Sequence, residues 1–169
     1  MPALLFLLPL VGLVWSDRPV AVSLVLYANL YALALYDHVT MRLPNLLTAA
    51  LVLTGLMQAY MLAPSLTPYL VGVLVGFLIF FCLGLFYERL RGRPGLGMGD
   101  IKFLAGAGAW VGWFGLPPLL LVASLAGLGG FLLKSLSAGR FDPDSPAPFG
   151  PYLCLGLWLT WLYFSRFGL

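Results

Sequence analysis

The six carboxylates of this chain fall into two groups by their surroundings. Four lie in polar breaks or close to them, where water can solvate them: Asp17, Glu88, Asp142 and Asp144. The other two border long apolar runs, because Asp37 directly follows Tyr36 and Asp100 directly precedes Ile101. If those runs cross a membrane, a carboxylate there costs roughly 3 kcal/mol. Asp37 and Asp100 are therefore the first candidates for a functional site.

The order of the apolar runs brings these two acids to one membrane face. From Asp37 the chain would cross by the run 45–63 and return by the run 67–87, and Asp100 opens the next run. Two carboxyl groups in one poorly solvated site cannot both ionise, so the pair holds one proton near neutral pH. One ionised and one protonated carboxyl can activate water and polarise an amide carbonyl. The pattern predicts a catalytic aspartyl pair.

Helix direction gives a hypothesis for the position of that proton. Asp37 ends an apolar run and Asp100 begins one. The negative end of a helix dipole opposes ionisation and the positive end favours it. This hypothesis makes Asp100 the general base and Asp37 the proton donor.

Glycines occupy alternate positions directly before Asp100, at Gly95, Gly97 and Gly99. They permit backbone conformations that a Cβ forbids, and they leave space for an extended substrate to reach the acid. A flexible loop that ends in an N-cap aspartate would show the same pattern. The glycines alone leave both interpretations open.

The composition indicates that lipid is the solvent for most of the chain. Hydrophobic residues make up 62%, charged residues 9%, and the mean hydropathy is +1.00, whereas soluble domains carry about 25% charged residues. The 169 residues allow six or seven spans of roughly 20 residues each. No length remains for a second, water-soluble domain. We therefore expect one integral membrane domain over residues 1–169.

The expected fold is an all-α, polytopic bundle of about seven transmembrane helices. The first run has no preceding Lys or Arg and no small-residue cleavage pattern after it, so we expect an uncleaved span rather than a signal peptide. Proline and glycine mark the breaks between runs. The runs are 2–16, 19–36, 45–63, 67–87, 101–116, 117–137 and 151–167.

Charge distribution predicts the orientation. The breaks at 37–44, 88–99 and 138–150 hold most of the Lys and Arg, whereas those at 64–68 and 115–118 hold none. Basic loops face the cytoplasm, so both acids are expected there, although Arg18 and Arg166 fall on the opposite side. This distribution explains the net charge of +3 without a nucleic-acid partner. Because Cys82, Cys154 and His38 share no ligand spacing, no zinc site is expected.

Three motifs, in order over residues 30–165, resemble those of the type IV prepilin peptidases. The stretch 97–104, Gly-Met-Gly-Asp-Ile-Lys-Phe-Leu, resembles the family's GxGD signature. The stretch 36–45 resembles its first aspartate motif, with a basic residue and a Leu-Pro pair after the acid. The stretch 148–153 resembles the Pro-Phe-Gly-Pro segment before the last span.

The resemblance implies an aspartic peptidase of the bacterial inner membrane that faces the cytoplasm. It would cleave the basic leader from a prepilin or pseudopilin, directly before the substrate's hydrophobic helix. Its catalytic residues would be Asp37 and Asp100, without metal or cofactor, and its partners would be that substrate and lipid. Supporting motif residues would be Gly97, Gly99, Pro44 and Lys102.

The chain departs from the bifunctional members of that family at its first connector. Those members carry a cytoplasmic segment with paired cysteines between the first span and the core, associated with N-methylation. Only Asp17 and Arg18 separate the first two runs here. A peptidase without methyltransferase activity is therefore expected.

Two other classes of function could use the same acids. A small ion- or proton-coupled transporter would place them near the bilayer midplane on broken helices, whereas here they border the spans. A silent scaffold has no reason to bury two carboxylates together. Lys102 is expected to contact lipid headgroups, and His38, one residue from Asp37 and about 100° around a helix, is expected to face the interface.

Overall fold

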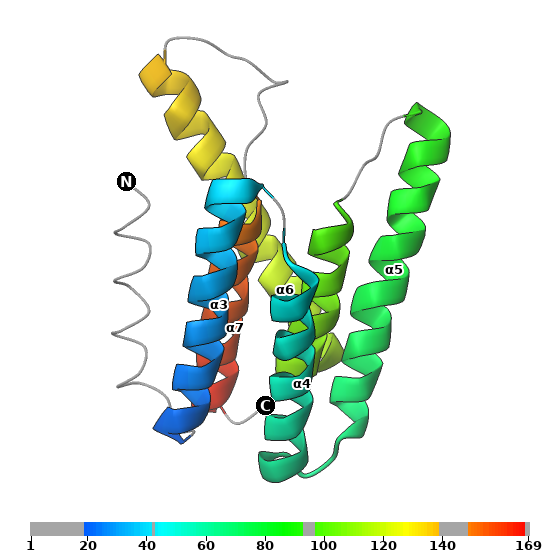
Figure 1. Cartoon of the computed structure of the whole chain (residues 1–169), viewed down its shortest axis with the longest axis vertical. Helices are drawn as coiled ribbons and strands as arrows, with labels where there is room; N and C mark the ends of the chain where they lie inside the picture. The colour runs from blue at the N-terminus through cyan, green and yellow to red at the C-terminus, as the bar shows by residue number, and fades with distance from the viewer. Residues whose placement is uncertain (1–18, 42, 93–96, 139–148, 168–169) are drawn as a thin grey trace.

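The computed structural model describes residues 19–41, 43–92, 97–138 and 149–167. Every regular element in these ranges is an α-helix, as expected for the all-α class (Figure 1). The described residues contain five helices rather than about seven, and the run 2–16 lies outside them. The helices are α3 (Val20–Thr40), α4 (Asn45–Leu62), α5 (Thr67–Arg91), α6 (Met98–Ala138) and α7 (Gly150–Phe167).

A residue in the left-handed conformation follows the last residue of α3 and of α5. α3 continues past Asp37 to Thr40, and Met41, at φ 51°, donates its N–H to the carbonyl of Asp37 at 2.8 Å. α5 ends in the same way at Gly92, at φ 65°. The helices thus run a few residues beyond the apolar runs, because a helix ends where a cap satisfies its last carbonyls.

The runs 101–116 and 117–137 form one element, α6, which is sharply kinked at Gly112. Gly112 has φ 68° and ψ 178°, a conformation that essentially only glycine adopts. The break therefore lies before the expected position at 115–118, and Pro117 and Pro118 lie inside the second arm of α6. We had expected the prolines to end the run, but the glycine is the residue whose backbone can make the bend.

The chain reverses direction at this kink. Gly115, just after it, lies against Phe164 near the end of α7, whereas Gly127 lies against Phe149 at the start of α7. The second arm of α6 is therefore antiparallel to α7. Both ends of α6 consequently point to the same end of the bundle (Figure 1).

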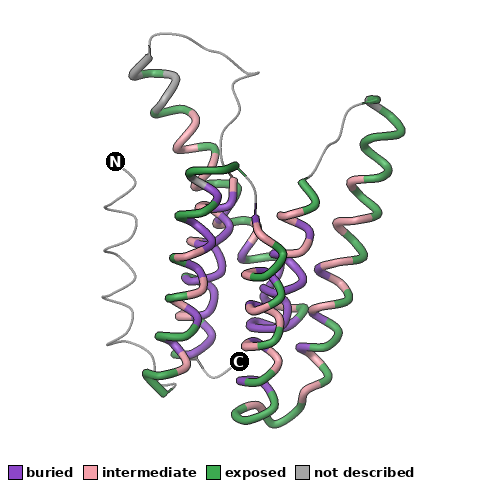
Figure 2. The backbone as a smooth tube through the Cα atoms, viewed as in Figure 1, coloured by how far each residue is buried: buried purple, intermediate pink, exposed green. Residues whose placement is uncertain are grey.

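The first arm of α6 forms the centre of the fold. Every residue from Phe103 to Val111 is buried, and α6 contacts α4, α5 and α7 (Figure 2). Gly72 of α5 lies against the backbone of Gly108, and Gly76 lies against that of Leu104. Small residues let helices approach closely in lipid, where dispersion contacts rather than the hydrophobic effect hold them together.

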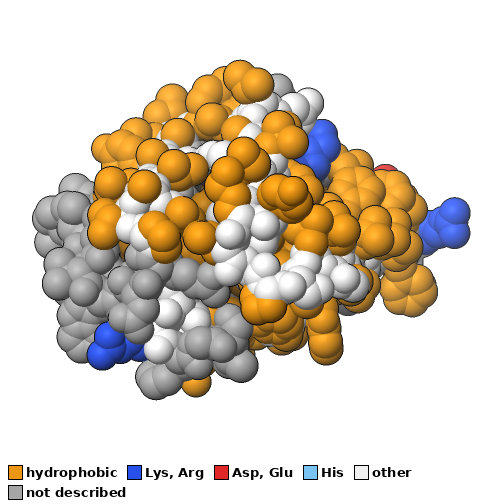
Figure 3. Space-filling model, turned by 90° about the horizontal axis from the view of Figure 1, so that it is seen from below, with side chains coloured by type: hydrophobic (Ala, Val, Ile, Leu, Met, Phe, Trp, Pro, Cys, Tyr) orange, Lys and Arg blue, Asp and Glu red, His pale blue; other side chains and the backbone are white. Residues whose placement is uncertain are grey.

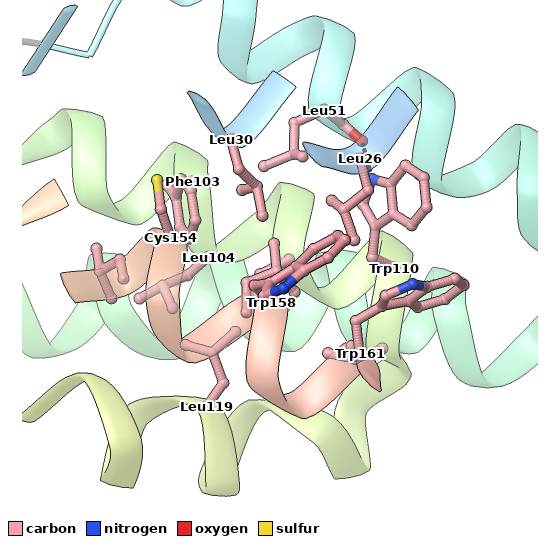
Figure 4. Packing of buried hydrophobic residues seen from close by; sticks show 14 of the residues in the cluster. Leu26, Leu30, Leu51, Phe103, Leu104, Trp110, Leu119, Cys154, Trp158 and Trp161 are labelled. Carbon is pink, nitrogen blue, oxygen red and sulfur yellow. Dashed lines mark hydrogen bonds between the residues drawn. The ribbon is translucent and has the colours of Figure 1, made fainter. Parts of the chain in front are cut away.

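A hydrogen-bonded tryptophan fastens α4 to this arm. The indole Nε1 of Trp110 donates to the carbonyl of Leu51 at 3.0 Å, and Gln58 donates to the carbonyl of Trp110 at 3.4 Å. Trp161 of α7 meets the Trp110 ring edge-on, with centroids 5.2 Å apart (Figure 4). Trp110 and Trp161 are therefore packing residues, whereas Trp113 and Tyr163 are exposed, as interfacial anchors would be.

The outer surface is apolar. Leu46, Leu53 and Leu133 are each more than two-thirds exposed, and hydrophobic side chains cover most of the described surface seen from one end of the bundle (Figure 3). Within the described residues, four helical segments are long and apolar enough to cross a bilayer: Val20–Asp37, Asn45–Leu62, Thr67–Leu90 and Met98–Leu133. The chain is a multi-pass α-helical membrane protein.

Candidate active site

Asp37 lies in the last turn of α3 with its side chain buried. Only 6% of the residue is exposed. Its Oδ2 accepts a hydrogen bond from the backbone N–H of Gly150, the first residue of α7, at 3.1 Å. The structure thus joins the end of α3 to the start of α7 through one carboxylate.

Asp100 lies in the first turn of α6, two residues after the helix begins. Its own N–H donates to the carbonyl of Gly97 at 3.0 Å. Its side chain is half-buried, and a Cβ added to Gly97 would lie 3.3 Å from its Oδ2. The absence of a side chain at Gly97 therefore leaves this carboxylate uncovered on that side.

The connector after Asp37 packs against the turn that carries Asp100. A Cβ added to Gly99 would lie 3.0 Å from the Cβ of Leu43, which is buried. The next residue, Pro44, is the N-cap of α4 and accepts the N–H of Thr48 at 3.2 Å. Contact between Gly99 and Leu43 brings the segments of the two acids together.

The end of α3, which carries Asp37, and the start of α6, which carries Asp100, lie at the same end of the bundle (Figure 1). The two carboxyl groups lie within electrostatic range of each other, and both lie within electrostatic range of the thiol of Cys154. The two carboxyl groups, the Gly150 amide and a buried thiol thus form one small site built from α3, α6 and α7.

Lys102 makes a contact that the sequence did not predict. Its ammonium donates to the side-chain oxygen of Asn45, the first residue of α4, at 2.7 Å. We had expected a contact with lipid headgroups, but a polar side chain at the start of α4 lies within reach of the lysine. Lys102 therefore links α6 to α4 beside the site.

Two contributors were not anticipated. Cys154, which looked isolated in the sequence, is buried one helical turn after Gly150, and the spacing of four residues was its only signal. The contact of Gly150 with Asp37 joins residues 113 positions apart, which no local pattern reveals. The side chain of His38, the glycine Gly95 and the basic residues Arg42 and Arg93 lie outside the described residues.

The geometry suits acid–base chemistry on a neutral polar bond. A pair of carboxyls that shares one proton offers an acceptor for a proton of water and a donor for a carbonyl oxygen. Because Asp37 is buried and Asp100 is half-buried, bulk water has limited access to the two carboxyl groups. Hydrolysis of an amide is therefore within the chemical reach of the site.

Comparison with known proteins gives consistent matches. The model of the type IV leader peptidase family matches residues 24–132. A prepilin leader peptidase/N-methyltransferase of Dickeya chrysanthemi is 36% identical over 150 residues, which cover 86% of this chain and 52% of that protein. The leader peptidase HopD of Salmonella typhimurium is 35% identical over 139 residues, or 81% of this chain and 90% of HopD.

Coverage differs between these relatives. A Burkholderia pseudomallei prepilin leader peptidase/N-methyltransferase is 37% identical over 78% of this chain but only 42% of its own length. The chain thus spans about half the length of the prepilin leader peptidase/N-methyltransferases it matches. No solved structure matches it.

Proposed function

The chain belongs to the type IV leader peptidase family, and we propose that it is an aspartic endopeptidase that removes the basic leader from prepilin-like substrates. The observation that carries this proposal is the meeting of Asp37 and Asp100, from separate helices, at one end of an apolar bundle. The name of HopD, a leader peptidase of which the alignment covers 90%, supports the same activity.

Asp37 and Asp100 are the catalytic pair in this proposal. One acts as general base toward water, and the other donates its proton to the carbonyl oxygen of the scissile amide. The exposed Gly97 leaves the approach to Asp100 free for an extended substrate segment, and the half-buried Gly99 lets Leu43 pack closely beside it. Pro44 and Lys102 support the site by fixing the start of α4.

The substrate's shape matches the position of the site. A prepilin-like protein presents a basic leader followed by a hydrophobic helix, so its cleavage point lies where the helix leaves the bilayer. The two acids lie at helix ends, next to apolar segments that can cross the membrane. A transporter would instead need its acids at midplane depth.

The site faces the cytoplasm of a bacterial inner membrane in this proposal. Arg89 at the end of α5, on the same side as the start of α6, supports this orientation. With the run 2–16 as a first span and the two arms of α6 as separate crossings, the chain would cross the bilayer about seven times. The two-residue break at Asp17 and Arg18 supports a peptidase without methyltransferase activity.

Co-expression with a candidate prepilin tests this function. We expect Asp37→Ala and Asp100→Ala each to abolish leader removal, detected as a mobility shift of the substrate. Glu88→Ala is the matched control, because Glu88 is an exposed carboxylate at the end of α5, and it should process normally. Processing that survives either aspartate change, with the protein present in the membrane, would refute the proposal.

A further inference from the structure

In the first turn of α7, the backbone N–H of Gly150 makes no hydrogen bond within the helix and is available to a partner outside it. The N–H groups of Tyr152 and Leu153 both donate to the carbonyl of Phe149, at 3.1 and 3.2 Å. Pro151 has no N–H. The remaining donor, the N–H of Gly150, points to Oδ2 of Asp37 at 3.1 Å.

Only glycine permits this approach. A Cβ at position 150 would lie 2.6 Å from Oδ2 of Asp37 and 2.8 Å from its Cγ. Real Cβ atoms do not come that close to other heavy atoms, so any larger residue would push the carboxylate away. The sequence Phe149-Gly150-Pro151 thus both frees the donor and makes room for its acceptor.

This contact bears on which acid holds the shared proton. A backbone N–H can only donate, and a hydrogen bond from a donor favours the charged form of a carboxylate. The positive end of α7, an 18-residue helix, acts in the same sense. Asp100 on α6 and Cys154 on α7 are titratable groups that also interact with this site, while the Lys102 ammonium donates to Asn45.

We propose that Gly150 is a positioning residue that holds Asp37 as the ionised, water-activating acid and leaves the shared proton on Asp100. The proposal deepens the peptidase function above and rests on it for its catalytic meaning. It reverses the assignment from helix direction, because α7 supplies a direct hydrogen bond that the α3 sequence alone could not indicate.

The proton balance of the reaction then follows. Asp37 takes a proton from water as the water oxygen bonds to the carbonyl carbon, and Asp100 gives its proton to the carbonyl oxygen. In the second step the C–N bond breaks, the leaving nitrogen takes the proton from Asp37, and Asp100 recovers a proton from the tetrahedral intermediate. Both acids return to their starting states.

Infrared spectroscopy of the protein in lipid nanodiscs tests the proton position without any substrate. With isotopically labelled aspartate, and with the Asp37→Asn/Asp100→Asn double variant as baseline, the wild type should show a protonated-carboxyl band at neutral pH. The band should disappear in Asp100→Asn. It should return in Asp100→Asn/Gly150→Pro, because proline, which is tolerated at the first position of a helix, lacks the N–H and its Cβ pushes the carboxylate away.

Gly129→Ala in the Asp100→Asn background is the matched control. A Cβ there meets nothing within 4 Å, so the band should stay absent. A band that persists in Asp100→Asn, or fails to return with Gly150→Pro, overturns the proposal. Because this readout needs no cleavage, it separates failure of the proton assignment from failure of the peptidase function.

Separate effects on kcat and KM give the second readout. Gly150→Pro should lower kcat of the intact protein at least tenfold and leave KM within about twofold, since Gly150 acts on the general base rather than on the substrate. Gly129→Ala, whose added Cβ meets nothing within 4 Å, should leave both unchanged. An effect on KM alone would overturn the positioning role.

Discussion

Asp37 and Asp100 occupy unlike surroundings within one site. Asp37 is buried and accepts a hydrogen bond from the start of another helix, whereas Asp100 is half-buried beside the side-chain-free Gly97. In the proposed mechanism, the acid that a backbone donor holds and the acid that is open to the substrate have different roles. At this scale the sequence identified the two carboxylates as candidates, because so few acids border apolar runs, but it could not predict the contact of Gly150 with Asp37, which joins residues 113 positions apart.

Lys102 and Asn45 provide a test of the contact between α6 and α4. Their 2.7 Å hydrogen bond is partly open to solvent, so we expect a coupling energy of about 0.5–1 kcal/mol. A double-mutant cycle of Lys102→Met and Asn45→Ala, followed by unfolding in detergent, measures it. Coupling of zero within error would mean that the lysine acts on lipid instead, as its position in the sequence had suggested.

At the scale of the helices, α6 positions the site. Its first arm leads away from the end of the bundle that holds the acids, and its second arm returns to that end. Hydrophobic runs predicted both arms, and they are present. The position of the bend was predicted wrongly at 115–118, because two prolines are a stronger local signal than one glycine. The bend occurs at Gly112 because it needs a residue with positive φ, here 68°, and the φ of proline is fixed at a negative value.

Gly112→Ala tests that explanation of the bend. Alanine would be strained at this φ and ψ, and its Cβ would lie 2.9 Å from the Phe114 ring, so we expect a loss of about 1–3 kcal/mol in stability. The fall should appear as a lower midpoint of thermal or denaturant unfolding.

Gly129→Ala is the matched control on the same helix. Its added Cβ meets nothing within 4 Å, so the substitution should be neutral or stabilise the helix by up to about 1 kcal/mol. Equal losses at the two positions would show that the bend does not depend on the conformation of Gly112.

At the scale of the whole molecule, the composition established the class of protein and the fold follows from it. A surface of exposed leucines and a centre of closely packed small residues and tryptophans is a membrane bundle. The number of helices could not be fixed from hydropathy, because a hydrophobic run does not show whether its neighbour continues it through a kink. The proposed orientation depends on the alternation of charged and uncharged connectors.

Cysteine labelling tests that orientation in a Cys82→Ala/Cys154→Ala background. Ser65→Cys, in the uncharged connector between α4 and α5, should react with a membrane-impermeant thiol reagent on intact spheroplasts. Glu88→Cys, exposed at the other end of α5, should react only after permeabilisation. The reverse pattern would place the two acids outside the cytoplasm.

The kinetics of leader cleavage by purified protein, compared among Asp37→Asn, Asp100→Asn and the double variant, test the shared dyad most directly. Each single change should lower kcat by about 10²–10⁴-fold, and the double variant should fall no further, since residues that act as a unit are not additive. A single variant within a few-fold of wild type, or losses that multiply in the double variant, would contradict a single site formed by Asp37 and Asp100.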